Sequence, residues 1–446
     1  MSGATKQVKK HDARPLTERQ LVLMIIMITL PMTLVHSPSD IVQFGQQHAY
    51  LCIILVYLVL LICIWLLSRT QRRFGSQNLF QAMIGRRPFV GRVIVGMYVL
   101  YYFYILARDA RLLTEYVDTT ILPLTPVMII LLCIFVMSGF IIRGGMKSVV
   151  SMTEIFMPIL ILTIFMIPLF VSGALDFHYL KPFFPVDLIG VGNGTWYFFS
   201  YAGEIIILPF IFGKETFKLK SAVKGLSFAF FLLVIDIIMM ILIIGLPIIP
   251  RISYPSHELV RQVQISDFLD RFDMFLAAAI LPIHMTKVAF NTYVVCYGMG
   301  CLDKNISGRM MQGPIILLGY VCAFWFFKDS IQLFKFDREW SAIVLFFTLV
   351  MPVLIYLIFR PSKKNKTDGV TQNKQSAQNE ESQNGSSSQE GEPTETEKSN
   401  QTGKSAQAEK STQKAQSAQN ESSQRRSSAQ KGGNSQNGNA GSAEGS

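Results

Sequence analysis

Long runs of apolar residues alternate with short polar segments between residues 20 and 360 of this chain. Residues 41–68, 119–142, 155–175 and 340–359 contain no Asp, Glu, Lys or Arg. An apolar run of about 18 or more residues is long enough to cross the ~30 Å hydrocarbon core of a bilayer as a helix. The pattern therefore predicts an all-α polytopic membrane protein.

Ten transmembrane helices are predicted from these runs. They are expected at residues 20–38, 49–68, 91–116, 121–142, 152–173, 196–213, 224–250, 268–298, 311–327 and 340–359. Basic residues test this number, because the cytoplasmic loops of membrane proteins are enriched in Lys and Arg. If the N-terminus is cytoplasmic, the inner segments carry nearly three times as many basic residues as the outer segments. Both termini are therefore expected in the cytoplasm.

Two of the predicted spans are interrupted. The first, LVLMIIMITLPMTLVHSP, contains Pro31 and ends at Pro38, and the sixth contains Gly203, Glu204 and Pro209. If the ten spans form two five-helix repeats, these two spans occupy corresponding positions, and the odd number of spans makes the second repeat inverted. Paired interrupted helices indicate a binding site near the middle of the membrane. The polar backbone that a proline frees is tolerated there only inside protein or beside a cavity.

The two ends of the chain differ in composition from its middle. Residues 1–19 are polar and basic, and residues 20–360 hold the ten predicted helices. Residues 361–446 are rich in Ser, Gln and Asn, lack aromatic residues, and repeat QSAQNEESQ as QSAQNESSQ. Such a segment cannot bury enough apolar surface to offset the entropy of ordering it. We expect a disordered cytoplasmic tail that is either a tether for partners or a dispensable extension.

Charged residues near the end of the third predicted span share one helical face. Arg108, Arg111 and Glu115 follow the i, i+3, i+7 spacing, Arg111 and Glu115 form an i,i+4 pair, and Asp109 is adjacent. A charge at the bilayer centre costs about 2.5–3.5 kcal/mol on insertion scales, so such residues face the protein interior and have partners. Two interpretations remain: an ion-pair cluster that orients the helix near the outer interface, or an Arg108 that meets a substrate carboxylate.

Two tyrosines extend this face toward the start of the helix. Tyr101 and Tyr104 precede Arg108 at helical spacing. Aromatic stripes pack more often than they bind ligands, but a tyrosine hydroxyl in a bilayer still needs a hydrogen-bond partner. Both tyrosines are therefore candidate binding residues.

The eighth predicted span, FLAAAILPIHMTKVAFNTYVV, is unusually polar. Lys287 and Asn291 share a face at i,i+4, with His284 one turn earlier. Lys287 is a candidate partner for Glu204 or Asp236, the carboxylates of the sixth and seventh spans. The alternatives are a buried structural ion pair, a lysine that takes the place of a bound cation, and a proton relay through His284.

Glu204 is the only charged residue of YFFSYAGEIIILPFIF, residues 197–212. Its candidate partners are Lys287 and Arg108. Because it lies in an interrupted span, we place it in a cavity rather than in a purely structural ion pair.

Acidic and basic residues within the spans nearly balance, which favours mutual pairing over a metal site. The sequence contains no P-loop, dinucleotide-binding, zinc-protease or nucleophile-elbow motif. We therefore predict no enzyme, no cofactor and no metal. The net charge of +11 reflects membrane topology rather than nucleic-acid binding.

Four stretches carry a family resemblance: LTERQLVLMIIMITLPMTLVHSP, YVLYYFYILARDARLLTEYVDTTILPLTP, IIRGGMKSVVSMTEIFMPILIL, and LDFHYLKPFFP with FFSYAGEIIILPFIF. Together they resemble the permease-like B subunit of nutrient germinant receptors from endospore-forming bacteria, within the amino acid–polyamine–organocation superfamily. The resemblance implies an amino acid or similar germinant bound between spans 1 and 6, with spans 3 and 8 lining the site. Carried over by element, the implied binding residues are Thr29, Pro31, Met32, Thr33, Ser200, Tyr201, Gly203 and Glu204.

The resemblance also implies an A-type membrane subunit and a C-type lipoprotein as partners in the spore inner membrane. One feature departs from the superfamily, whose first span usually breaks at glycines that offer bare N–H groups to a carboxylate. Here that place reads LPMTL, without glycine. Three functions remain open: a germinant sensor, a proton- or cation-coupled amino acid transporter, and a scaffold that works without ligand.

Overall fold

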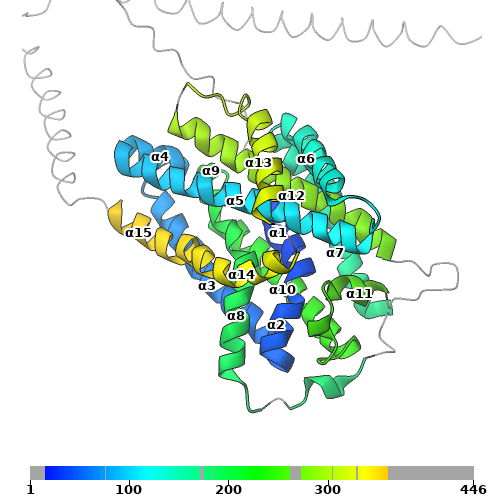
Figure 1. Ribbon diagram of the computed structural model, residues 1–446. Coiled ribbons are helices and arrows are strands. Elements are labelled where there is room, and N and C mark those ends of the chain that lie inside the picture. The colour runs from blue at the N-terminus through cyan, green and yellow to red at the C-terminus, as the bar shows by residue number, and fades with distance from the viewer. Residues whose placement is uncertain are drawn as a thin grey trace, which may run out of the picture. The chain divides into compact units, whose positions relative to one another are not determined.

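The computed structural model describes residues 16–359, apart from residues 76, 171–174, 183, 262–272, 304 and 328–329. The predicted basic N-terminus lies almost entirely outside the described residues, and the predicted disordered tail lies wholly outside them. The described part of the chain forms helices and no strands (Figure 1).

Each of the ten predicted spans overlaps a helix or a broken pair of helices, although residues 171–173 of the fifth span and 268–272 of the eighth lie outside the described residues. The α-helices are α1 (Glu18–His36), α2 (Pro38–Gly45), α3 (Ala49–Gln71), α4 (Leu79–Arg86), α5 (Pro88–Thr120), α6 (Val127–Arg143), α7 (Met146–Phe170), α8 (Leu188–Ala202), α9 (Leu208–Ile211), α10 (Leu219–Ile243), α11 (Pro255–Arg261), α12 (Asp273–Leu302), α13 (Gln312–Phe326), α14 (Ser330–Leu345) and α15 (Met351–Ile358). Short turns are η1 (Gln46–His48), η3 (Phe177–Leu180), η4 (Gly203–Ile207), η5 (Ile249–Arg251) and the π-helical η6 (Phe346–Val350).

Among the described residues, six helical segments are long and apolar enough to cross a membrane. They are α1, α2–α3, α5, α7, α10 and α14–α15, and α6 and α13 are shorter apolar helices. Large apolar side chains are exposed on the outside of the bundle, including Ile62 on α3, Leu100 on α5 and Trp325 on α13. Charged side chains such as Arg108 and Lys287 are buried instead. This distribution fits a protein surrounded by lipid.

Local sequence signals set several helix boundaries. Thr17 and Gln20 form a capping box at the start of α1, with the Thr17 side chain accepting from the Gln20 N–H. Asp187 caps α8 by accepting hydrogen bonds from the N–H groups of Ile189 and Gly190. Pro88 starts α5 at the first helical position, where its missing N–H costs nothing.

The two interrupted spans break in different ways. In the sixth, α8 ends at Ala202 and the chain continues as the 3₁₀ turn η4, which begins at Gly203 as predicted. In the first, the expected interruption at Pro31 is wrong, because α1 continues through Pro31 and ends at His36. A proline removes only one helical hydrogen bond, and close packing on every side of α1 keeps the helix intact. The break lies at Ser37, and Pro38 begins α2.

Helix packing brings four elements together in the bundle interior. α5 packs along α12, and α12 also contacts α1, α6 and α7 (Figure 1). α1 packs against α10 and touches both α8 and η4. The broken sixth span therefore packs against α1, and α8 also packs against α2, α3 and α14. α5 and α12, which carry most of the predicted polar residues, reach it through individual side chains.

Candidate functional site

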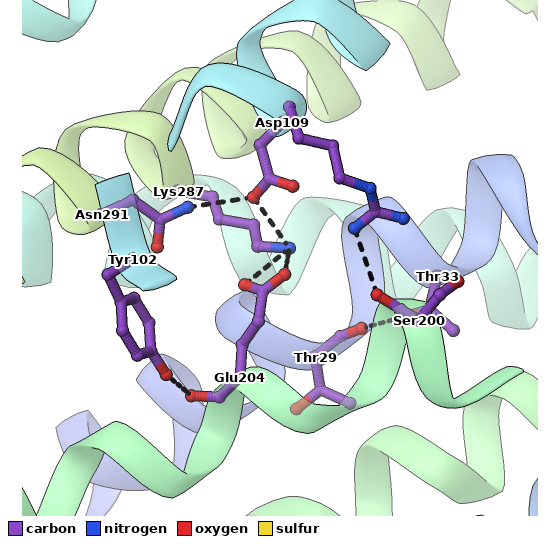
Figure 2. A network of polar contacts seen from close by, with 9 residues as sticks. Thr29, Thr33, Tyr102, Asp109, Ser200, Glu204, Lys287 and Asn291 are labelled. Atoms are coloured by element: carbon purple, nitrogen blue, oxygen red, sulfur yellow. Dashed lines mark hydrogen bonds and ion pairs between the residues drawn. The ribbon is translucent and has the colours of Figure 1, made fainter. Parts of the chain in front are cut away.

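A buried lysine joins two carboxylates at the centre of the bundle. Lys287 Nζ on α12 lies 3.1 Å from Oε1 and 3.0 Å from Oε2 of Glu204 on η4. The same Nζ lies 3.2 Å from Oδ2 of Asp109 on α5. Lys287 and Asp109 are completely buried, and Glu204 nearly so. Of the two partners predicted for Lys287, Glu204 is therefore confirmed, and Figure 2 shows both carboxylates converging on the lysine.

Two neutral side chains complete this ion cluster. Asn291 Nδ2, one turn after Lys287, donates to Asp109 Oδ2 over 2.9 Å. The Tyr102 hydroxyl on α5 donates to the Glu204 backbone carbonyl over 2.6 Å. The cluster thus ties α5, η4 and α12 together through charged and polar atoms (Figure 2).

Arg108 contacts the end of α8 rather than Glu204. Its Nη1 donates to the Ser200 carbonyl over 3.1 Å, and its guanidinium carbon lies 4.7 Å from the ring centroid of Tyr201. Ser200 lies in the last turn of α8, where carbonyls lack helical partners. A positive charge is favourable at such a helix end. Arg108 therefore holds the α8 terminus against α5.

Two buried hydroxyl groups, one on α1 and one on α8, have no hydrogen-bond partner in the described part of the chain. These atoms are Thr29 Oγ1 and Ser200 Oγ, both fully buried. Thr33, by contrast, donates from Oγ1 to the Thr29 carbonyl over 2.5 Å. Buried hydroxyls normally have partners, and each exception needs an explanation. Here the two unpartnered groups come from the first and sixth spans, where the sequence places a binding site.

The remaining predicted side chains of α5 and α12 lie around the cluster. Tyr101 stacks on Trp340 and Phe347 with ring centroids 5.7 and 4.3 Å away, and Tyr104 lies 4.0 Å from Trp340. Both tyrosines therefore face α14 and its continuation, η6. These contacts favour aromatic packing as the interpretation of this tyrosine stripe. His284 Nδ1 lies 2.9 Å from the Ile280 carbonyl of its own helix.

Three predicted residues lie in the interrupted spans without a polar contact to the cluster. Pro31 and Met32 are buried inside α1. Gly203 permits a close approach, because a Cβ at this position would lie 2.5 Å from both Thr348 Oγ1 and Val344 Cγ1. The glycine thus lets the broken sixth span pack tightly against the tenth.

The other predicted charges have separate partners. Arg111 and Glu115 form the expected i,i+4 ion pair, with Nη2 2.5 Å from Oε1. Asp236 does not meet Lys287; its Oδ2 lies 3.2 Å from the Ser256 hydroxyl. Within the described residues, no group of three or more His, Cys, Asp or Glu side chains is arranged to hold a metal ion.

Sequence reasoning did not assign site roles to Tyr102, Asp109, Asn291 or His36. Asn291 was detectable, because it shares a helical face with Lys287. His36, at the end of α1, is buried, stacks on Tyr201 at 6.5 Å and has no hydrogen-bond partner among the described residues. Its position depends on the break after α1, which lies six residues beyond the expected one.

Comparisons with known proteins add to this geometry. A family described as "Spore germination protein" matches residues 15–329. A putative spore germination protein of Bacillus subtilis (strain 168), YfkT, is 30% identical over 333 residues, which cover 74% of this chain and 92% of that protein. Spore germination protein KB of the same organism is 23% identical over 309 residues, with coverages of 67% and 81%.

The fold also resembles that of a solved transporter. MHP1, a nucleobase-cation-symport-1 family transporter in a closed conformation, matches with a TM-score of 0.51 and 14% identity, over 74% of this chain and 75% of that chain. This likeness shows the fold alone: a LeuT-type arrangement, in which two repeats have inverted topology and interrupted helices meet near the midplane. The fold class predicted from the sequence is confirmed.

Proposed function

Because this chain belongs to the spore germination protein family, we propose that it is the permease-like B subunit of a nutrient germinant receptor. In this role it binds a small germinant, most simply an amino acid, and changes conformation without needing to complete transport. The site lies between α1 and the α8–η4 break, with α5 and α12 beside it.

The observation that carries this proposal is a set of buried charges of both signs around η4, counted over the described residues. Lys287 and Arg108 supply two positive charges, and Asp109 and Glu204 supply two negative charges. A free amino acid carries one charge of each sign. Its carboxylate is attracted to the cationic side chains and its ammonium group to the carboxylates, so binding leaves the net charge of the protein interior balanced.

The same cluster supports a sensing role. Lys287 bridges carboxylates on two elements, η4 and α5, and any ligand group that replaces one of these contacts changes what holds the elements together. A ligand shifts a conformational equilibrium only by its differential affinity for the two states. Exchange of internal ion pairs for ligand contacts supplies such a difference.

The assembly and location belong to the proposal as well. We place the chain in the spore inner membrane, with an A-type membrane subunit and a C-type lipoprotein as partners and both termini in the cytoplasm. The basic inner loops support this orientation. Reporter domains fused before residue 1 and after residue 446 are both expected to be active in the cytoplasm, and an external signal from either fusion would contradict it.

Thermal unfolding of the purified subunit, or of its complex, tests ligand binding. Amino acids and nucleosides are screened one at a time, and at least one amino acid is expected to raise the melting temperature. The Glu204→Gln variant is expected to lose that shift, whereas Glu258→Gln, which alters an exposed ion pair with Arg261, is expected to keep it. Normal ligand responses in spores that carry Glu204→Gln and Lys287→Met would overturn the site.

A coupled amino acid transporter is the second candidate, favoured by the fold shared with MHP1. Reconstituted liposomes distinguish the two. Accumulation of the germinant amino acid against its gradient would replace the sensor with a transporter. Binding without accumulation supports the sensor.

A further inference from the structure

Pro38 leaves one carbonyl of α1 without its helical donor. In an α-helix the Leu34 carbonyl accepts from the N–H four residues later, and Pro38 has no N–H. The Ser256 hydroxyl, on α11, lies 2.5 Å from the Leu34 oxygen and supplies the missing donor. A side chain more than 200 positions away in sequence therefore completes the broken end of the first span.

The same hydroxyl also contacts a buried carboxyl group. Asp236 Oδ2, on α10, lies 3.2 Å from Ser256 Oγ, and only 4% of the Asp236 residue is exposed. Within the described part of the chain, no Lys, Arg or His side chain forms an ion pair with Asp236. An ionised carboxylate in apolar surroundings is strongly unfavourable without such a partner, whereas the neutral acid is tolerated.

The number of protons available to the Leu34–Ser256–Asp236 contacts bears on whether Asp236 is protonated. A serine hydroxyl has one proton and donates one hydrogen bond. The shorter contact, to the Leu34 carbonyl, uses that proton, because a carbonyl has none to give. With that proton engaged, a neutral carboxyl group can complete the 3.2 Å contact by donating its own proton to Ser256 Oγ.

We propose that Asp236 is a buried proton-binding site, in which the protonated carboxyl donates to Ser256 and Ser256 donates to the Leu34 carbonyl. When the proton leaves, the Oδ2–H bond breaks, the bonding electrons stay on the carboxylate and the proton passes to water. The Ser256 proton then turns to the carboxylate, because charged acceptors form the stronger hydrogen bond. The Leu34 carbonyl loses its donor.

Proton occupancy at Asp236 is thereby linked to the break between α1 and α2. This link involves only Leu34, Asp236 and Ser256, so it does not depend on which ligand the protein binds. It adds a coupling element beside the proposed site: α1 carries both the Leu34 carbonyl and the unpartnered Thr29 hydroxyl.

Neighbouring titratable groups do not substitute for this site. α10 packs against α1, α3, α7, α11 and η3. At this end of those elements the titratable groups are His36, Tyr50, Cys52, His178, Tyr179, His257, Glu258 and Arg261. His257 Nδ1 lies 3.1 Å from the Tyr116 hydroxyl, and Glu258 pairs with Arg261. The remaining charges of α1 and α7 lie at the far end, where Gln20 donates to Glu154.

Infrared spectroscopy of the full chain tests the proton directly. Protein carrying aspartate labelled with ¹³C at its side-chain carboxyl is expected to show, near neutral pH, an isotope-shifted carbonyl band of a protonated acid. Asp236→Asn is expected to abolish this band, and Asp303→Asn, at an exposed loop aspartate, to leave it. Absence of an isotope-shifted band in the unmodified protein, or its persistence in Asp236→Asn, would overturn the proposal.

A second variant keeps the test decisive if Asp236→Asn does not fold. Ser256→Ala removes the hydroxyl that accepts a hydrogen bond from protonated Asp236, so the carbonyl band of Asp236 is expected to move to higher frequency. An unmoved band would contradict the hydrogen bond from Asp236 to Ser256. Hydrogen exchange measures the coupling. Ser256→Ala is expected to speed exchange of α2 amides several-fold, whereas Asp236→Asn, whose amide still donates to Ser256, is expected to change it less. Equal exchange in Ser256→Ala and unmodified protein would remove the link to α1.

Discussion

Lys287 Nζ lies 3.0 Å from Glu204 Oε2, with the lysine side chain completely buried and the glutamate nearly so. This contact joins α12 to the 3₁₀ turn that interrupts the sixth span. Asp109 shares the same ammonium group from α5. One positive charge therefore holds three elements, and its removal has different consequences from the removal of either carboxylate.

Lys287→Met is expected to destabilise the protein by about 3–5 kcal/mol, because it leaves two buried carboxylates without a compensating charge. Glu204→Gln is expected to cost less, since Lys287 keeps Asp109 as a partner. Thermal unfolding in detergent measures both. Adding Glu204→Gln and Asp109→Asn to Lys287→Met is expected to recover most of the loss.

Lys218→Met is the matched control for this experiment. Lys218 pairs with Glu18 over 2.9 Å, but both side chains are more than half exposed. Exposed ion pairs contribute little to stability. A melting temperature for Lys218→Met as low as that for Lys287→Met would show that burial of the charge is not the cause.

Arg108→Lys is expected to weaken ligand binding although the charge is kept. The guanidinium donates to the Ser200 carbonyl while lying over the Tyr201 ring, and a lysine ammonium cannot reproduce both contacts in that geometry. A desolvated cation–π contact is worth about 2 kcal/mol. Because this internal contact holds the α8 terminus beside the proposed site, its loss from the binding-competent conformation is expected to lower the affinity by roughly tenfold or more in a ligand titration. Arg111→Lys, which can keep its ion pair with Glu115, is the control and is expected to bind nearly normally.

Deletion of residues 361–446 is expected to leave the melting temperature and the ligand-induced shift unchanged. The segment is polar, repetitive and nearly free of apolar side chains, so it offers little surface to bury against the membrane domain. A chain cut within α15, which removes the buried Ile355, is expected to be less stable and serves as the comparison. A lower melting temperature on deletion of the tail alone would assign it a structural role.

The sequence predicted the helices and the main ion pair because both depend on simple constraints. A bilayer demands long apolar runs, and a buried carboxylate demands a partner, so Lys287 and Arg108 were the candidate partners of Glu204. The structure selects Lys287. The different partners of the adjacent residues Arg108 and Asp109 could not be predicted from the sequence. Adjacent helical residues point about 100° apart, and only the packed neighbours decide that one meets Ser200 and the other Lys287.

Two further features depended on tertiary contacts that leave no sequence pattern. Lys287 was one candidate partner for Asp236, but Asp236 contacts the Ser256 hydroxyl, on a short helix that follows a loop. The first span was expected to break at Pro31, yet it breaks at Ser37. Both prolines remove a helical N–H, and the surrounding packing determines which removal ends the helix.

Gly203→Ala is expected to destabilise the protein by about 1–3 kcal/mol, the usual range for overpacking a dense interior. The new Cβ would lie 2.5 Å from Thr348 Oγ1 and Val344 Cγ1, which forces the broken sixth span away from the tenth. Thermal unfolding of the purified protein measures the loss. Combining Gly203→Ala with Val344→Ala and Thr348→Ala removes both obstructing atoms. The triple variant is therefore expected to be about as stable as the double variant Val344→Ala with Thr348→Ala.

Gly192→Ala distinguishes this steric effect from a general intolerance of α8 to alanine. Gly192 is in the same helix, and a Cβ there meets no atom within 4 Å. Alanine favours a helix by up to about 1 kcal/mol over glycine, so this variant is expected to be neutral or slightly more stable. If Gly203→Ala and Gly192→Ala destabilise the protein equally, the close approach of the sixth and tenth spans does not explain the glycine at position 203.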